Sequence, residues 1–281
     1  MNNIKTILVI GASGNQGNAV ATNLLSDGWA VRAMTRNPEQ PSIQALKEKG
    51  ATVVKADMDD EQSLSDVMKG VYGVYSVQSF DNNDPEKEIR QGKRVADLAK
   101  KASVSHFVYS SAAGAERYDG AQNFATKWQI EEHIRSLDLP STILRPTFFM
   151  DNFEGFAKGQ DGKIVIQGFM DPEIKLQMIA VQDIGAFANI AFKNPEQLIG
   201  ESIEIAGEEK TLTEISEKIS KTFDAPCEIV DSREKFQKMM KMFEWFEFGG
   251  YEANISKLRE INPQLLDFDA WVKHSGWNPL K

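Results

Sequence analysis

Three glycines near the start of the chain, Gly11, Gly14 and Gly17, stand between an apolar run at residues 7–10 and a helical pattern at residues 18–25. Glycine permits a tight turn and close approach to the backbone, while exposed amides and the positive end of the following helix attract phosphates. This order of strand, glycine turn and helix is typical of the pyrophosphate site for a dinucleotide, the alternative being a closely packed turn without a ligand. The cofactor contacts expected here are Gly11, Ser13, Gly14, Asn15, Gln16 and Gly17.

The strand expected next, at residues 29–35, is followed by Arg36 rather than by an acid. An acid at this position would bind the ribose hydroxyls of NAD, whereas a base can accept the additional 2′-phosphate of NADP. Arg36 therefore predicts NADP(H) as the cofactor. The alternative is a solvated arginine at the end of a strand.

Strand and helix patterns alternate along the first half of the chain. Six strands are expected at residues 7–10, 29–35, 52–56, 74–77, 106–111 and 141–145, and helices at 18–25, 62–68, 85–102 and 123–137, with another ending at 46–50. Such alternation predicts an α/β fold, a Rossmann-like doubly wound parallel sheet with helices on both faces. Residues 1–150 are expected to form the NADP-binding domain.

The pattern becomes less regular after residue 146. Strands are expected at residues 163–166, 176–180 and 202–206, and helices at 183–192 and 212–223. Residues 151–281 are therefore expected to form a smaller α/β lobe on the substrate side, interleaved with the first domain. Within it, aromatic residues and methionines at residues 236–248 predict a helix packed on this lobe, or a lid over an aromatic pocket.

Ligands of doubly wound sheets bind outside the carboxyl ends of the strands, so residues that follow the later strands are further candidates. Gln78 and Ser79 follow the fourth strand, Ser111 the fifth, and Thr147 and Phe149 the sixth. The first three are expected beside the nicotinamide half of the cofactor. Thr147 and the phenylalanine pair after it are expected to wall the nicotinamide or substrate pocket, or to seal the joint between the lobes.

Composition limits the location and partners of the chain. One cysteine, Cys227, cannot form an internal disulfide, so a reducing compartment is expected, and the location predicted is the cytoplasm. A net charge of −9 without a basic block argues against direct binding of nucleic acid or an anionic membrane. The three histidines show no ligand spacing, so no metal site is expected.

The glycine turn, the motif at residues 35–38, residues 56–60, Lys127, residues 145–153 and residues 183–185 together resemble the NmrA-like family of atypical short-chain dehydrogenase/reductase proteins. The resemblance covers nearly the whole chain and implies that Asp57 and Met58 lie beside the adenine. The alternative is that Asp57 or Asp59 caps the next helix. The family includes NADP-binding regulators, redox-sensing proteins and reductases of quinones, so the resemblance leaves the activity open.

In catalytic members of the wider superfamily, a tyrosine four residues before a lysine protonates the carbonyl oxygen. Lys127 stands where that lysine would, but Asn123 takes the place of the tyrosine, and Tyr109 and Tyr118 are the nearby substitutes. Lys127 is expected to contact the cofactor. It could also be the catalytic acid, as isoflavone-reductase-type relatives suggest, if burial makes its ammonium more acidic, or it could simply pair with Glu131.

Two functions are consistent with the sequence. One is an NADPH-dependent reductase of quinones or similar small electrophiles, which need less acid catalysis because their reduced oxygens are stabilised phenolates. The other is a non-catalytic NADP(H) redox sensor that acts through a regulatory protein partner. Whether the chain is an enzyme is left open, and a homodimer is compatible with either function.

Overall fold

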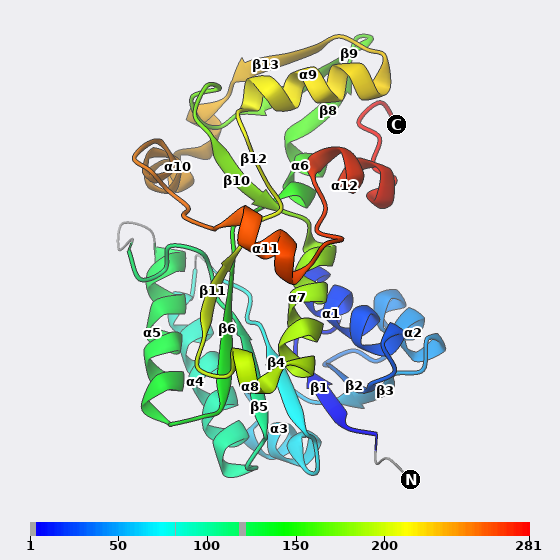
Figure 1. Cartoon of the computed structure of the whole chain (residues 1–281), viewed down its shortest axis with the longest axis vertical. Coiled ribbons are helices and arrows are strands. Elements are labelled where there is room, and N and C mark those ends of the chain that lie inside the picture. The colour runs from blue at the N-terminus through cyan, green and yellow to red at the C-terminus, as the bar shows by residue number, and fades with distance from the viewer. Residues whose placement is uncertain (1–3, 82, 118–121) are drawn as a thin grey trace.

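Short apolar strands form a seven-stranded parallel sheet in the larger of two lobes (Figure 1). The computed structural model describes residues 4–81, 83–117 and 122–281. The strands follow the order β11-β6-β5-β4-β1-β2-β3 across the sheet. Their bounds are β1 (Thr6–Val9), β2 (Ala30–Thr35), β3 (Thr52–Lys55), β4 (Gly73–Ser76), β5 (His106–Ser110), β6 (Ser141–Pro146) and β11 (Ser202–Ile205).

Helices cover both faces of this sheet, as the alternating pattern predicts. One face carries α1 (Asn15–Ser26), α2 (Pro41–Glu48) and α7 (Val181–Lys193), which is followed by the short α8 (Pro195–Leu198). The other carries α3 (Glu61–Met68), α4 (Pro85–Lys101) and α5 (Gln122–Ser136). In β1, Ile7 and Val9 are buried beneath the first set and Leu8 beneath the second, so the strand is apolar from Ile7 to Val9. The Rossmann-like fold is confirmed.

The sheet gains its seventh strand from the second half of the chain. The sequence analysis assigned residues 202–206 to the smaller lobe, whereas β11 pairs in parallel with β6, from Ser202 opposite Ile143 to Ile205 opposite Pro146. Helix α7 likewise packs on α1 of the larger lobe. That assignment was wrong because an apolar strand pattern shows that a segment forms a strand, but not which sheet it joins.

The smaller lobe contains two three-stranded sheets and an aromatic core. The sheets have the orders β12-β10-β7 and β13-β9-β8. Phe153, Phe169, Phe243 and Phe268 are fully buried in the core. The strands are β7 (Phe148–Phe149), β8 (Ala157–Gln160), β9 (Lys163–Gly168), β10 (Leu176–Ile179), β12 (Glu208–Lys210) and β13 (Cys227–Asp231). The helices are η1 (Met150–Asn152), α6 (Phe153–Phe156), α9 (Leu212–Phe223), η2 (Arg233–Met239), α10 (Met240–Glu247), α11 (Ile255–Ile261) and α12 (Phe268–Ser275).

The aromatic segment at residues 236–248 is not one helix. It divides into η2 and α10, with non-helical backbone at Phe236. Phe243 and Phe246 are buried in the core of the smaller lobe, which fits the prediction of a packed helix. Among the described helices, none combines the length and apolar character that a bilayer crossing needs.

Asp183, near the start of α7, is buried and ties the C-terminal part of the chain to the larger lobe. Its carboxylate accepts a hydrogen bond from the amide of Leu266 at 3.0 Å. Burial raises the pKa of the Asp183 carboxyl to about 6, although the Leu266 amide and the charge of Arg259 oppose this shift. The folded protein therefore binds a proton here in a pH range where the unfolded chain has released it.

Asp183→Asn is expected to make the free energy of unfolding depend less on pH than it does in the wild type. When folding raises the pKa of an aspartate, the proton that it holds stabilises the folded protein at low pH. This contribution to the free energy of unfolding is lost as the pH rises from the unfolded pKa of about 4 through the folded pKa. Relative to the asparagine variant, the free energy of unfolding of the wild type should fall by about 2 kcal/mol between about pH 4 and pH 7.5. Urea unfolding of both proteins at these two pH values measures this difference, and parallel pH curves would contradict the prediction.

Candidate functional site

A cleft of about 1170 Å³ lies at the carboxyl ends of the parallel strands, between residues of the two lobes. All fifteen residues predicted to bind the cofactor line this one cleft: Gly11, Ser13, Gly14, Asn15, Gln16, Gly17, Arg36, Asp57, Met58, Gln78, Ser79, Ser111, Lys127, Thr147 and Phe149. They come from the loops after β1, β2, β3, β4, β5 and β6, from the first turn of α1, from β7 and from α5. Parallel strands explain the convergence, because all their carboxyl ends meet at one edge of the sheet.

The glycine turn has a geometry that other residues would disturb. Gly11 has φ +75°, and its carbonyl accepts a hydrogen bond from the amide of Gly14 at 3.0 Å. A Cβ on Gly17 would lie 2.2 Å from the carbonyl oxygen of Gly11, whereas one on Gly14 would lie 3.5 Å from it. Gly17 is therefore required for close packing between the turn and α1, while Gly14 leaves open space beside the backbone.

Helix α1 begins at Asn15, three residues earlier than predicted, so its first turn lies within the glycine motif. Gly14 is the N-cap, no described side chain caps the helix, and its first turn contains no acid. The first amides of a helix lack intrahelical acceptors and carry the positive end of the helix dipole. These amides fit a pyrophosphate. The Gln16 side chain anchors the turn by accepting a 2.7 Å hydrogen bond from Ser110.

Arg36 follows β2 at the rim of the cleft and is exposed. Within the described part of the chain, no ion pair joins its guanidinium to an acid. An unpaired guanidinium beside a nucleotide cleft has five donors available for a phosphate. This placement is the one that the NADP prediction requires.

The loop after β3 places Asp57 and Met58 in the cleft. The predicted alternative, that Asp57 or Asp59 caps the following helix, is wrong: Asp60 is the N-cap of α3 and accepts from the amides at positions 62 and 63. Asp59 instead bonds to Gln91 at 2.8 Å. Among the described residues, the Asp57 carboxylate accepts only the amide of Asp59, so it shapes the loop rather than the helix.

Two buried polar atoms in the cleft lack partners among the described residues. Gln78 donates from Nε2 to Ser76 Oγ at 2.9 Å, but its Oε1 is unpaired, as is the Oγ of Ser111. An unsatisfied buried polar atom costs about 1–3 kcal/mol, so a ligand that hydrogen-bonds to both atoms would be stabilised. This unused hydrogen-bonding capacity fits the polar half of a nicotinamide cofactor, which these residues are predicted to contact.

Lys127 lies on α5 and makes a buried ion pair. Its Nζ is 2.7 Å from Oε1 of Glu88, whose side chain is fully buried and also accepts from Thr126. The predicted alternative, a pair with Glu131, is wrong, because Glu131 binds Arg145 and Arg135. The Glu88 carboxylate holds the Lys127 side chain in place at the cleft, where its ammonium can donate to a ligand hydroxyl or phosphate.

No described tyrosine replaces the one missing before Lys127 in the way the sequence analysis considered. Tyr109 is fully buried in β5, does not line the cleft, and has its pKa raised well above 10, first by burial and then by Glu88 and Glu131. Tyr118 lies outside the described residues. Position 123 holds asparagine. The described cleft therefore contains Lys127 without a neighbouring tyrosine on the same helix.

Thr147 and Phe149 lie both at the joint between the lobes and in the wall of the cleft. Thr147 Oγ1 donates to the carbonyl of Ile205 at 3.2 Å, and β7 pairs Phe149 with Ile179 of β10, so the segment joins the lobes. Both residues also line the cleft. No cluster of three or more His, Cys, Asp or Glu that could hold a metal occurs among the residues described.

The sequence analysis missed most of the cleft wall contributed by the smaller lobe. Phe156, Met242 and Tyr251 line the cleft, together with Phe80 from the loop after β4 and with Phe148 at the start of β7, which the sequence had already indicated. Met242 belongs to α10, so the packed helix also borders the cleft, as the lid alternative expected. A signal existed for Tyr251: it directly follows Gly249 and Gly250, which interrupt the aromatic helix.

The fold and the glycine turn define a Rossmann-like α/β protein with a second lobe over the ends of its strands. A sequence model of the NmrA-like family matches residues 3–271, and the chain belongs to this family. An NmrA-like family domain-containing protein of Dictyostelium discoideum is 30% identical over 294 residues, covering 93% of this chain and 97% of the relative.

Solved structures share the whole fold at low sequence identity. One is the negative transcriptional regulator NmrA in complex with NADP, with a TM-score of 0.82, 20% identity, and coverage of 96% of this chain and 94% of the other. Another is the NADPH-dependent quinone oxidoreductase of Escherichia coli in complex with NADPH, with a TM-score of 0.79, 20% identity, and coverage of 98% and 100%. At this identity the likeness extends to the fold alone.

Proposed function

We propose that this protein binds NADP(H) and reduces quinones or similar small electrophiles with NADPH. The proposal rests on the set of residues that line a single cleft. It joins the glycine turn and Arg36 to an aromatic wall that includes Phe148, Phe156 and Tyr251. Aromatic walls with few polar groups suit a flat, uncharged substrate. One of the proteins with the same fold is a quinone oxidoreductase.

Different residues of the cleft hold different parts of NADPH, which supplies a hydride when bound. The first amides of α1 bind the pyrophosphate and Arg36 binds the 2′-phosphate. Asp57 and Met58 lie at the adenine, while Gln78, Ser79, Ser111 and Lys127 hold the nicotinamide half. Thr147 and Phe149 wall the same half, toward the substrate.

The proposed substrate class follows from the weak acid catalysis that the cleft offers. Lys127 is ion-paired with Glu88, and no tyrosine precedes it on α5. A simple ketone needs a proton donor for its alkoxide, whereas a reduced quinone leaves as a stabilised phenolate. The Lys127 ammonium can stabilise such an oxygen electrostatically without giving up its proton.

The first test is a titration of the purified protein with NADPH and NADH, followed by tryptophan fluorescence. Quinones are then added and NADPH oxidation is measured in the same sample. Tight NADPH binding with quinone-dependent oxidation supports the reductase. Tight binding without turnover of any quinone contradicts this substrate class and favours the sensor.

Arg36→Ala is expected to abolish the preference for NADPH over NADH. A charged contact to the 2′-phosphate contributes about 1.5–3 kcal/mol, so NADPH affinity should fall by roughly 10- to 100-fold while NADH affinity changes little. Arg32, on the same strand, is a matched control, because its guanidinium is occupied by the carbonyls of Val67 and Lys69. Equal losses for both cofactors would contradict a role in phosphate selection.

A second candidate is the NADP(H) sensor that acts through a protein partner. The observation that favours it is the ion-paired Lys127 on a helix without the catalytic tyrosine, which suits binding better than proton transfer. A sensor requires that the oxidised and reduced cofactors stabilise different conformations. Cytoplasmic location, a homodimer and a regulatory partner remain predictions of the sequence.

A further inference from the structure

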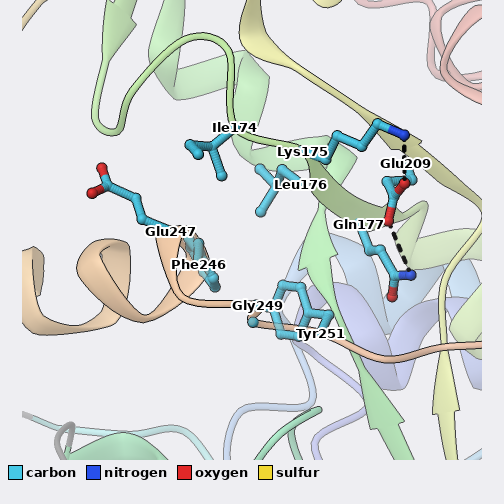
Figure 2. Close-up of a pocket in the computed structure, with 10 residues that line it drawn as sticks. Ile174, Lys175, Leu176, Gln177, Glu209, Phe246, Glu247, Gly249 and Tyr251 are labelled. Atoms are coloured by element: carbon cyan, nitrogen blue, oxygen red, sulfur yellow. Dashed lines mark hydrogen bonds and ion pairs between the residues drawn. The ribbon is translucent and has the colours of Figure 1, made fainter.

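A second, smaller pocket lies beside the substrate end of the cleft. It has a volume of about 210 Å³ and is formed by the chain at Ile174–Gln177, by Glu209, and by the end of α10 with the segment after it. Figure 2 shows it with Tyr251 as the lowest of the labelled side chains. Of the described residues that line either cavity, Tyr251 is the one shared by both, so it lies where the two cavities adjoin.

The backbone around Tyr251 is held by both lobes. The carboxylate of Glu204, on β11, accepts hydrogen bonds from the amides of Glu252 and Gly114 at 2.9 and 3.0 Å. On the other side, Gln177 of β10 exchanges two hydrogen bonds with the backbone of Ala253, at 2.9 and 3.1 Å. The segment that carries Tyr251 is therefore fixed from two independent elements.

The Tyr251 ring is also fixed by its aromatic neighbours. Trp245 meets it edge-on, with centroids 5.2 Å apart and an interplanar angle of 89°, and Phe246 lies at 5.1 Å. Such ring pairs stabilise the packing beyond the effect of the buried area alone. A ring restrained by these contacts and by its backbone acts as a rigid wall.

The small pocket suits an uncharged substituent. Leu176 and Phe246 are buried and give it apolar walls, together with Ile174. Its cation, Lys175, lies 3.4 Å from the carboxylate of Glu209, so these two charges are already compensated (Figure 2). The third charged residue of the lining, Glu247, directs its carboxylate away from the other side chains in Figure 2 and accepts a hydrogen bond from the amide of Asp171. A charged ligand group would have to compete with the pair of Lys175 and Glu209, whereas an alkyl group would not.

We propose that Tyr251 determines substrate size: its ring closes the substrate end of the cleft against the small pocket and excludes electrophiles with an apolar side chain. The inference rests on the proposed quinone reductase function. Removal of the ring should join the two cavities and admit such a side chain into the pocket between Ile174, Leu176 and Phe246.

The test uses two quinones with the same ring, a dimethoxy-methyl-benzoquinone and its derivative with one isoprenyl group. In Tyr251→Ala, the ratio of kcat/KM for the isoprenyl quinone to that for the bare quinone is expected to rise about 10-fold or more over wild type. Tyr251→Phe keeps the ring and should keep the wild-type ratio. An unchanged ratio in Tyr251→Ala would overturn the proposal.

Two further variants control for a folding defect in Tyr251→Ala and for binding of the side chain outside the small pocket. Tyr251→Leu keeps apolar packing and should raise the ratio in the same direction if the alanine variant fails to fold. Ile174→Phe in the Tyr251→Ala background should refill the pocket and return the ratio toward wild type. A ratio that stays high in this double variant would show that the side chain binds elsewhere, contrary to the proposal.

Binding measurements distinguish a failure of this inference from a failure of the proposed reductase function. If no quinone is reduced by the wild type, the reductase proposal fails. The two quinones are then titrated into the NADP⁺-saturated proteins, with tryptophan fluorescence as the readout. The same change in the ratio of dissociation constants supports a size-selecting wall without turnover, and an unchanged ratio rejects it.

Discussion

Gly17→Ala is expected to destabilise the cofactor-free protein and to weaken NADPH binding by roughly 10- to 100-fold. The added Cβ would lie 2.2 Å from the oxygen and 2.4 Å from the carbon of the Gly11 carbonyl, both backbone atoms that cannot rotate away. Helix α1 and the turn must therefore move apart. Thermal unfolding without cofactor measures the damage to the fold, and fluorescence titration measures the effect on NADPH.

Gly14→Ala is the matched control in the same turn. Its Cβ would be in ordinary contact, 3.5 Å from the Gly11 carbonyl oxygen, and Gly14 has extended backbone angles of φ −91° and ψ 170°. The melting temperature of the cofactor-free protein should hardly change. NADPH binding should nevertheless weaken, because the methyl group would occupy the space left for the pyrophosphate. Unchanged NADPH affinity in Gly14→Ala would contradict this placement of the phosphates.

Lys127→Met is expected to lower the free energy of unfolding by about 3–5 kcal/mol. Methionine keeps the length of the side chain but leaves the carboxylate of Glu88, whose side chain is fully buried, without its counter-ion. The cost comes from an uncompensated buried charge rather than from lost packing. Urea unfolding at neutral pH measures the loss.

The double variant Glu88→Gln with Lys127→Met should recover most of that stability. Glutamine removes the buried charge and can still accept the hydrogen bond from Thr126. Turnover of this double variant then reports on Lys127 in the reaction, free of the stability defect. We expect kcat to fall more than NADPH affinity, and an unchanged kcat would remove Lys127 from the chemistry. Equal stability of Lys127→Met and wild type would contradict the ion-pair argument.

The parts of the fold and site that could be predicted from sequence are those set by local patterns. Alternating strands and helices determine a doubly wound sheet, and that sheet brings the residues after each strand to one edge. Gly11, Arg36 and Gln78 could therefore be assigned to the same cleft without knowledge of a single contact. The role of each residue is predicted from its residue type, and the cofactor titrations and variants described above test it.

The parts that could not be predicted depend on contacts between distant segments. Lys127 pairs with Glu88, 39 residues away, although Glu131 stood at a suitable helical spacing. The spacing of Glu131 was misleading because Arg145, on β6, competes for it with a stronger two-point contact. Tyr251 likewise reaches the cleft only because elements of both lobes hold its segment.

The chain passes repeatedly between the lobes. After β10 in the smaller lobe it returns to form α7 and β11, and after α10 it returns again, so that Ala253 and Leu258 pack into the core under α1. A break after residue 150 would remove the edge strand β11 and uncover the face of the sheet beneath α7. The two lobes are therefore expected to form one cooperative folding unit, in which loosening of the substrate side also loosens the dinucleotide side.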